Sequence, residues 1–331
     1  MTNKQYYCQE LNNVLSCFHD RIMSCCSGQI GPVYIEGYKG EKIDWKAFKQ
    51  TKINAFNMLN DESINSSPCK GCYFLREKRE TDIISEKYTM INISHWTQCN
   101  CGCIYCARMN DSKGEITYKS KKSEYYDLAP VLKQLYKNNL LDKENLIAVI
   151  QGGDISVLKE FEDIVKIFLK NGVKKIHILT NNIVYQPIIK KLLEQNKGLL
   201  FTSLDCGCRE TYLKLKRVDK FNDTVANLKK YTAAMKESSV IVKYIVVQHF
   251  NDNKEEIKKF VDLMSEIKVE MVEFMIDNKW SMFTNLDEKP LPAHYGELYL
   301  YFKEECEKKG IKVKMWEKME YILSKYALNT Q

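Results

Sequence analysis

Strand-like and helix-like segments alternate through the middle of the 331-residue chain, from about Tyr88 to Asp277. Short runs rich in β-branched and apolar residues predict strands, and longer runs with apolar residues at helical spacing predict the helices between them. The predicted strands cover residues 88–94, 145–154, 174–182, 198–205, 239–248 and 269–277. The predicted helices cover residues 125–141, 157–172, 184–196, 221–237 and 253–267.

This alternation predicts an α/β fold with a parallel sheet, because two parallel neighbouring strands need a crossover of roughly a dozen residues or more between them. In sheets of this kind, functional sites gather at the carboxyl ends of the strands. We therefore expect the chemistry of this chain to lie in the loops that follow the predicted strands.

Residues 1–85 have a different character. Helical periodicity is weak there, and "GPVYIEGYKGEKIDW" reads as short strands joined by glycine turns. Six of the thirteen cysteines fall in this block, which we therefore expect to be a small cysteine-rich, metal-binding module.

Composition narrows the class of protein. The sequence contains no apolar run of membrane-spanning length, and "MTNKQYYCQELNN" at the start is no secretion signal, so we expect a cytoplasmic protein. In that reducing compartment, cysteines favour metal binding or catalysis over disulfides. The net charge of +7 is scattered along the chain, and we do not expect binding to nucleic acid or membranes.

The stretch "HWTQCNCGCIYC" follows the first predicted strand and carries three cysteines at the spacing Cys99-x3-Cys103-x2-Cys106. A zinc knuckle is one interpretation, with His95 and N-terminal cysteines as further ligands. The other is a [4Fe-4S] cluster held by three thiolates, which leaves one iron open for a ligand. Cys101 lies between these positions, and we interpret it as a bystander.

The three cysteines, the aromatic Tyr105 and their place in a six-unit β/α series resemble the signature of the radical S-adenosylmethionine (SAM) superfamily. The resemblance implies a partial (β/α)6 barrel over residues 86–282 and a C-terminal helical extension, 283–331, that closes it. It also implies an enzyme in which an electron from the cluster cleaves SAM to a 5′-deoxyadenosyl radical, which then abstracts hydrogen from an organic substrate. Flavodoxin or ferredoxin is the expected electron donor.

Within this resemblance, Gly152, Gly153 and Asp154 are similar to the "GGE" motif that holds the SAM amino group, with Asp where Glu is commoner; a plain turn is the alternative. Two thiols near the same site, Cys206 and Cys208, are weak candidates for hydrogen donors, and buried inert thiols are the alternative. The other residues that the resemblance places at the SAM site are Tyr105, Thr180, Asn181, Ser203, Asp205 and Arg217. Helix caps or a surface ion pair are the alternatives for the last three.

The N-terminal "SPCKGCYFLRE" resembles half of the auxiliary-cluster modules of the SPASM and twitch type. The ligands we expect for a second [4Fe-4S] cluster are Cys17, Cys26, Cys69 and Cys72, with Cys25 or Cys8 as replacements for one of them. Structural zinc is the alternative, since four thiolates suit zinc equally well.

The substrate is less defined. Likeness to radical SAM proteins of surface-polysaccharide biosynthesis implies a small molecule, a sugar or nucleotide-sugar, and the alternatives are maturation of a ribosomally made peptide or RNA modification. A non-catalytic iron–sulfur or zinc sensor is the alternative from another class, although such a protein would need neither the glycine pair nor six β/α units. The tyrosines at 295, 299 and 301 either pack in the core or contact substrate.

Overall fold

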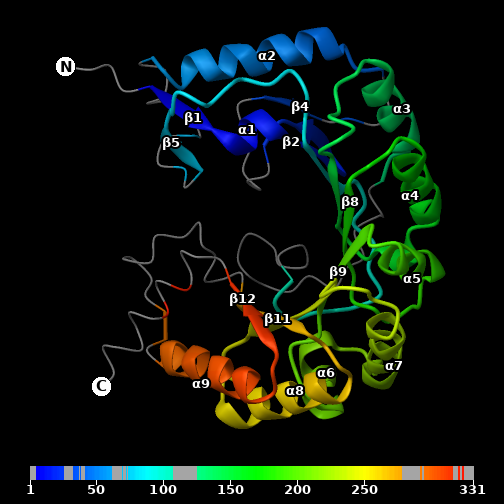
Figure 1. Cartoon of the computed structure of the whole chain (residues 1–331), viewed down its shortest axis with the longest axis vertical. Helices are drawn as coiled ribbons and strands as arrows, with labels where there is room; N and C mark the ends of the chain where they lie inside the picture. Colours follow the sequence, from blue (N-terminus) through cyan, green and yellow to red (C-terminus); the bar gives the residue numbers. More distant parts are fainter. Residues whose placement is uncertain are drawn as a thin grey trace. The chain divides into compact units, whose positions relative to one another are not determined.

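The computed structural model describes residues 5–25, 33–36, 38, 42–61, 69, 72, 74–106, 125–277, 291–292, 294–315, 320 and 323. The chain divides into two compact units (Figure 1). Unit 1 comprises Met1–Gln98 and Lys121–His177, and unit 2 comprises Cys99–Ser120 and Ile178–Gln331.

Unit 1 is built on a mixed sheet that includes the first two predicted strands, β6 and β7. Its strands, in order across the sheet, are β7 (Ile147–Ile150), β6 (Met90–Ser94), β2 (Val14–Phe18), β3 (Arg21–Met23) and β4 (Tyr34–Glu36). The first three are parallel, and β3 and β4 continue antiparallel. Two further strands, β1 (Tyr6–Cys8) and β5 (Leu75–Glu77), form a separate antiparallel pair.

The helices of unit 1 are α1 (Gln9–Asn13), α2 (Trp45–Met58), α3 (Ala129–Lys137) and α4 (Phe161–Lys170), with a short 3-10 helix at Ile155–Val157. Helix α4 buries Phe161, Ile164 and Phe168, which share one face because they recur at helical spacing. Helix α2, drawn in blue in Figure 1, begins after Asp44, whose carboxylate accepts two backbone N–H bonds of the first turn at 3.0 Å.

Strand β8 (Lys175–Leu179) belongs to both units, because the division falls after His177. The remaining strands of unit 2 are parallel, in the order β9 (Gly198–Ser203), β10 (Val240–Val246), β11 (Met271–Ile276) and β12 (Lys312–Lys314). Its helices are α5 (Pro187–Glu194), α6 (Arg209–Lys216), α7 (Phe221–Thr232), α8 (Lys254–Glu266) and α9 (His294–Lys308).

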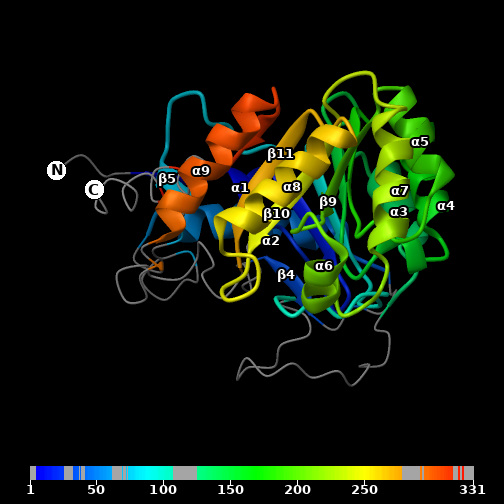
Figure 2. The ribbon, with the colours of Figure 1, turned by 90° about the horizontal axis from the view of Figure 1, so that it is seen from below.

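Aromatic side chains fill the core of unit 2. The rings of Tyr244 and Phe260 lie 4.9 Å apart, and those of Phe274 and Phe302 lie 5.1 Å apart. These contacts join β10 and β11 to α8 and α9, which lie side by side in both views (Figures 1 and 2). Tyr295 and Tyr299 of α9 are buried, as the packing interpretation of these residues expects.

Each of the six predicted strands contains one strand of the structure, β6 to β11, and the predicted α/β fold with a mostly parallel sheet is confirmed. Residues of the expected 1–85 module share unit 1 with β6 and β7, because β2 pairs in parallel with β6. Every helix in the described part of the chain is too short or too polar to cross a lipid bilayer.

Candidate functional site

The 99–106 segment of unit 2 is held against the end of α6 by backbone hydrogen bonds. Gly102 N–H donates to the Lys216 carbonyl and Ile104 N–H donates to the Leu215 carbonyl, both at 3.0 Å. The three predicted ligands remain accessible, since Cys99 is exposed and Cys103 and Cys106 are half-buried. The backbone of this loop is therefore fixed while its thiols stay open to a ligand.

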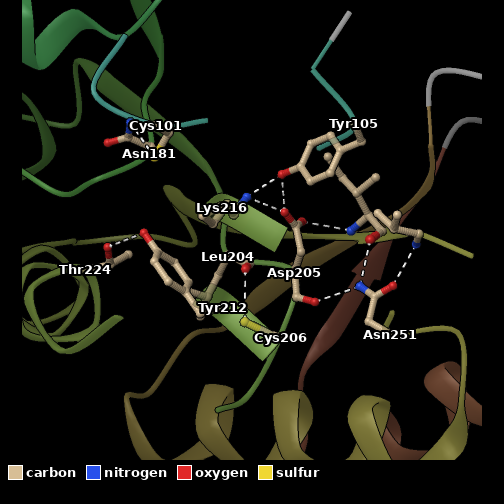
Figure 3. A network of polar contacts seen from close by, with 12 residues as sticks. Cys101, Tyr105, Asn181, Leu204, Asp205, Cys206, Tyr212, Lys216, Thr224 and Asn251 are labelled. Atoms are coloured by element: carbon tan, nitrogen blue, oxygen red, sulfur yellow. Dashed lines mark hydrogen bonds and ion pairs between the residues drawn. The ribbon is translucent and has the colours of Figure 1, made fainter. Parts of the chain in front are cut away.

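A buried ion pair lies directly behind the loop (Figure 3). The ammonium of Lys216 contacts both the Asp205 carboxylate and the Tyr105 hydroxyl, and that hydroxyl also donates to the carboxylate. The side chains of Asp205 and Lys216 are 0% and 2% exposed. Because Tyr105 stands between two of the predicted ligands in sequence, this network ties the cluster loop to the end of β9 and to α6.

The Asp205 carboxylate is fully engaged by the protein. Its second oxygen accepts a hydrogen bond from Ile245 N–H at 2.9 Å, while Asn251 donates its side-chain amide to the Asp205 and Ile245 carbonyls at 2.8 Å (Figure 3). Asp205 also adopts a left-handed backbone conformation, with φ of 67°. These bonds hold its carboxylate against Lys216 and Tyr105.

The surroundings of Cys103 favour a thiolate. A hydrogen bond from Cys101 and the nearby charge of Lys216 together outweigh burial and lower the pKa of Cys103 to about 6. Hydrogen bonding with Cys103 and Cys99 raises the pKa of Cys101. Cys101 thus lies between two predicted ligands as a hydrogen-bond partner of both.

Asn181 links the end of β8 to the same loop. Its amide nitrogen lies 2.5 Å from Asn100 Oδ1, 3.3 Å from Cys101 Sγ and 3.8 Å from Cys99 Sγ. Thr180 is buried, and its hydroxyl accepts a hydrogen bond from Asn182 N–H at 3.2 Å. Asn181 therefore contacts the cysteine loop directly.

The glycine pair lies in unit 1 and packs against the backbone that precedes the cysteine loop. A Cβ on Gly153 would lie 1.8 Å from the Gln98 carbonyl oxygen, and Gly152 has φ of +144° and lies against Trp96. Asp154 N–H donates to the Gln98 carbonyl at 2.8 Å, and the Asp154 carboxylate caps the 3-10 helix through Ser156 N–H at 2.9 Å. Glycine is thus required at both positions by the backbone itself.

The remaining predicted residues lie at different depths. Ser203 is half-buried at the end of β9, whereas Arg217 is exposed, with φ of 57°, at the carboxyl end of α6. Cys206 is fully buried and its thiol donates to the Leu204 carbonyl at 3.4 Å. Cys208 is half-buried, with its thiol 3.3 Å from Thr211 Oγ1. Cys208 is the more accessible candidate for a hydrogen donor.

The N-terminal cysteines separate into two groups. Cys17 is fully buried in β2, where burial raises its pKa to about 12 against the opposing effect of the Tyr126 hydroxyl. Cys69 and Cys72 instead influence the ionisation of Cys8, as does Cys25. Cys26 lies outside the described residues.

Two site residues, Lys216 and Asn251, were not predicted. Lys216 follows Tyr212 by four positions on α6, so both lie on its buried face, and this spacing was a signal for an inward-pointing lysine. Asn251 follows β10 in an irregular turn and holds it by side-chain bonds, including one from Val247 N–H at 2.6 Å. No local sequence pattern identifies such a role.

The cysteine spacing, the fixed loop and the parallel strands agree with a comparison against known families. The model described as "Radical SAM superfamily" matches residues 93–264, just over half of the chain. The chain belongs to the radical SAM superfamily. It is therefore an enzyme, the predicted resemblance is confirmed, and membership implies a [4Fe-4S] cluster and SAM as its cofactors.

Individual proteins of known name or structure are also similar to this chain. Molybdenum cofactor biosynthesis protein moc-5 of Caenorhabditis elegans is 27% identical over 197 residues, which is 59% of this chain and 31% of that protein. The structure of Streptococcus suis SuiB bound to precursor peptide SuiA is similar with a TM-score of 0.54 and 14% identity, covering 90% of this chain and 59% of SuiB. SuiB bound to S-adenosylmethionine gives a TM-score of 0.53 at 14% identity, covering 84% and 57%. This chain thus spans about a third of the curated relative and less than two thirds of SuiB.

Proposed function

We propose that this radical SAM enzyme binds its [4Fe-4S] cluster through Cys99, Cys103 and Cys106 and abstracts a hydrogen atom from a peptide substrate. The observation that carries the cluster assignment is the fixed 99–106 loop with three accessible thiols and a buried cation behind it. Three thiolates leave one iron open for SAM, and the bound cluster supplies the electron that cleaves the sulfonium.

The donor set fits this group. Lys216 places a positive charge beside Cys103, which favours the thiolate form that iron binds. Cys101 N–H lies 3.4 Å from Cys99 Sγ, and such a donor stabilises charge on a ligating sulfur. Asp205, Lys216 and Tyr105 are positioning residues, because their mutual contacts hold the cysteine loop in place.

We assign the binding of SAM to residues near the loop on the strand ends. Asn181 already contacts the cysteine loop, and Ser203 and Thr180 end neighbouring segments of unit 2. Asp154 keeps its capping role in this assignment.

A peptide is proposed as the substrate in place of the carbohydrate that the sequence resemblance implied. The support is the similarity to SuiB bound to precursor peptide SuiA, which covers 90% of this chain and so extends well outside residues 93–264. The similarity therefore includes elements outside the segment that defines the family.

Cleavage of SAM tests the cluster assignment. The anaerobically reconstituted chain, reduced with dithionite or flavodoxin, is expected to form 5′-deoxyadenosine from SAM, and Cys103→Ala is expected to lower the rate at least a hundredfold. Cys306→Ala is the matched control, because Cys306 is a buried thiol of α9 outside the site. Absence of 5′-deoxyadenosine from a reduced, intact cluster in the presence of peptide would contradict the assignment.

Transfer of deuterium tests the substrate. Candidate peptides encoded near this gene, made in fully deuterated form, are expected to pass deuterium into 5′-deoxyadenosine, because the abstracted hydrogen ends on its 5′ carbon. Deuterated nucleotide sugars are expected to transfer none. The opposite pattern, measured by mass spectrometry, would restore the carbohydrate assignment and exclude the peptide.

A further inference from the structure

Three charged side chains form a row across the sheet of unit 2. In the parallel registers of β10, β11 and β12, Lys243 lies opposite Glu273, and Glu273 lies opposite Lys314. Side chains at paired positions of neighbouring strands project from the same face of a sheet. Lys243, Glu273 and Lys314 therefore share one face, and we call them the charged row.

The charged row lies on the face opposite to helices α8 and α9. Tyr244 and Phe274, which follow Lys243 and Glu273 in sequence, point toward these two helices and contact their aromatic rings. Because successive side chains of a strand alternate between faces, Lys243 and Glu273 point the other way. The aromatic core of unit 2 therefore does not cover the charged row.

Both lysines of the row converge on one aromatic ring. The Lys243 ammonium lies 5.5 Å from the centroid of the Phe201 ring, and the Lys314 ammonium lies 5.1 Å from the same centroid. Strand β12 is at the edge of the described sheet, and a lysine that only protects such an edge extends into solvent. Lys314 instead reaches back over the sheet to a residue of β9, which brings two positive charges around one ring.

The one negative charge of the row is already engaged. Glu273 Oε2 lies 3.3 Å from Lys243 Nζ, and these side chains are 4% and 16% exposed. Lys314 is exposed, and within the described ranges its ammonium contacts the Phe201 ring and no carboxylate. Two ammonium groups and one carboxylate leave one positive charge in excess, which a single additional carboxylate would balance.

The charged row adjoins the network behind the cysteine loop. Asp205 N–H donates to the Lys243 carbonyl at 3.2 Å, and the Asp205 carboxylate accepts a hydrogen bond from Tyr105 of the loop. Lys243 is thus one backbone hydrogen bond away from the residue that holds the loop. A substrate group on the charged row would lie in the same unit as the cysteines that we assign to the cluster.

We propose that the charged row binds a carboxylate of the peptide substrate. Lys243 and Lys314 donate to this carboxylate, and the ion pair with Glu273 holds the Lys243 ammonium in position. A carboxylate matches the single excess charge of the row, whereas a phosphate group carries more negative charge than the row would neutralise. The inference rests on the proposed function, because it takes the substrate to be a peptide.

Capture of synthetic peptides by the reconstituted full chain tests this site. The probes are two libraries of short peptides of random sequence, one with free and one with amidated carboxyl termini. The wild-type chain is expected to enrich carboxylate-bearing peptides about tenfold, which one charge-assisted hydrogen bond would provide. Enrichment of Asp and Glu in the amidated library assigns a side-chain carboxylate, and a preference for free over amidated termini assigns the terminal one.

Substitutions with opposite expected effects separate binding from a structural role. Lys314→Glu, at an exposed position, is expected to abolish the preference for carboxylates and to enrich Lys and Arg in the captured peptides. Glu273→Gln removes the competing carboxylate and is expected to raise carboxylate enrichment roughly threefold. Adding Lys243→Gln to Glu273→Gln is expected to lower it about tenfold from that level. A purely structural ion pair would instead make Glu273→Gln capture less than the wild type.

Lys258→Glu is the matched control, because it makes the same charge change at an exposed lysine of α8, on the other side of the strands. It is expected to keep the wild-type preference, and circular dichroism checks that every variant is folded. Three results would overturn the proposal: a wild-type chain without a preference for carboxylates, a Lys314→Glu chain that keeps it, or a Lys258→Glu chain that loses it.

Capture requires neither reduction of the cluster nor cleavage of SAM, so its failure is distinct from failure of the proposed function. A chain that forms 5′-deoxyadenosine but shows no preference for carboxylates contradicts the assignment of the charged row alone. A chain that prefers carboxylates but forms no 5′-deoxyadenosine contradicts the cluster assignment alone.

Discussion

Lys216 is a buried cation, and its contacts predict a large cost for removing it. Its ammonium contacts the Asp205 carboxylate and the Tyr105 hydroxyl in a site 2% exposed. Lys216→Met leaves the Asp205 charge buried without its cation, so we expect a loss of about 3–5 kcal/mol in the free energy of unfolding. Denaturant unfolding measures this loss at neutral pH.

The double variant Lys216→Met/Asp205→Asn is the control for a charge effect. It removes both charges, so we expect it to be more stable than Lys216→Met alone. If the double variant is instead as unstable as the sum of the two single variants, the ion pair is not what holds these residues in place.

Gly153 supports a second prediction at the residue scale. A Cβ there would lie 1.8 Å from the Gln98 carbonyl oxygen, so Gly153→Ala forces the backbone apart, and we expect a loss of about 3 kcal/mol. Gly172→Ala is the matched control, since Gly172 has φ of +80° with nothing within 4 Å, and its expected cost is backbone strain of roughly 1 kcal/mol. Equal losses in denaturant unfolding would show that contact with Gln98 is unimportant.

The single residues also show which features of the site a local sequence motif can predict. The spacing of the cysteines and the glycine pair could be predicted, because both depend on short local sequences. The orientation of Asp205 could not, since it is set by Ile245 N–H and Lys216, residues on other elements. A motif therefore locates a carboxylate but does not determine what it faces.

At the scale of elements, helix α2 depends on its N-cap. Asp44 accepts hydrogen bonds from Lys46 N–H and Ala47 N–H, so Asp44→Ala is expected to destabilise the helix by about 1 kcal/mol. Hydrogen exchange of the α2 amides is expected to quicken, while that of α8 in unit 2 is unchanged. Asp44→Asn keeps an acceptor at the cap and is expected to exchange like the wild type; faster exchange in both variants would exclude the cap as the cause.

Periodicity predicted β6 to β11 and five of the helices between them, because each buries apolar residues at regular spacing. Helices α2 and α6 were missed for a physical reason. Helix α2 buries Lys52 among its inward residues, and α6 buries Thr211 and Lys216, so apolar spacing alone does not reveal either helix. Their inward polar groups are satisfied by contacts far away in the sequence, as when Lys52 donates to the Ser85 carbonyl at 3.0 Å.

At the scale of the whole molecule, the N-terminal residues contribute strand β2 to the sheet of unit 1. Strand β2 pairs with β6 over its full length, from Val14 opposite Met90 to Phe18 opposite Ser94. Such a pairing joins distant segments without any local signal, so the sequence pattern could not reveal it. The N-terminal segment between Cys8 and Cys25 therefore contributes β2 and β3 to the sheet of unit 1.

Acid is expected to weaken unit 1 through His95. This side chain is 0% exposed, its ring lies 5.0 Å from that of Trp96 and 5.5 Å from that of Tyr126, and neither ring nitrogen has a hydrogen-bond partner among the described residues. Burial lowers the pKa of His95 to about 4. The unfolded chain, with an ordinary pKa of about 6.5, takes up a proton that the folded chain excludes.

The direction in which stability changes with pH follows from this difference in pKa. The stabilising contribution of neutral His95 is complete above pH 6.5 and is lost as the pH falls toward 4, so between pH 7.5 and 5 we expect a loss of about 2 kcal/mol from this residue. His95→Phe removes the titrating group, and its free energy of unfolding, followed by tryptophan fluorescence, is expected to fall less over that range. The same substitution at the exposed His294 is the control and should keep the wild-type slope. Parallel pH profiles for wild type and His95→Phe would show that protonation of this buried ring does not limit the stability of the fold.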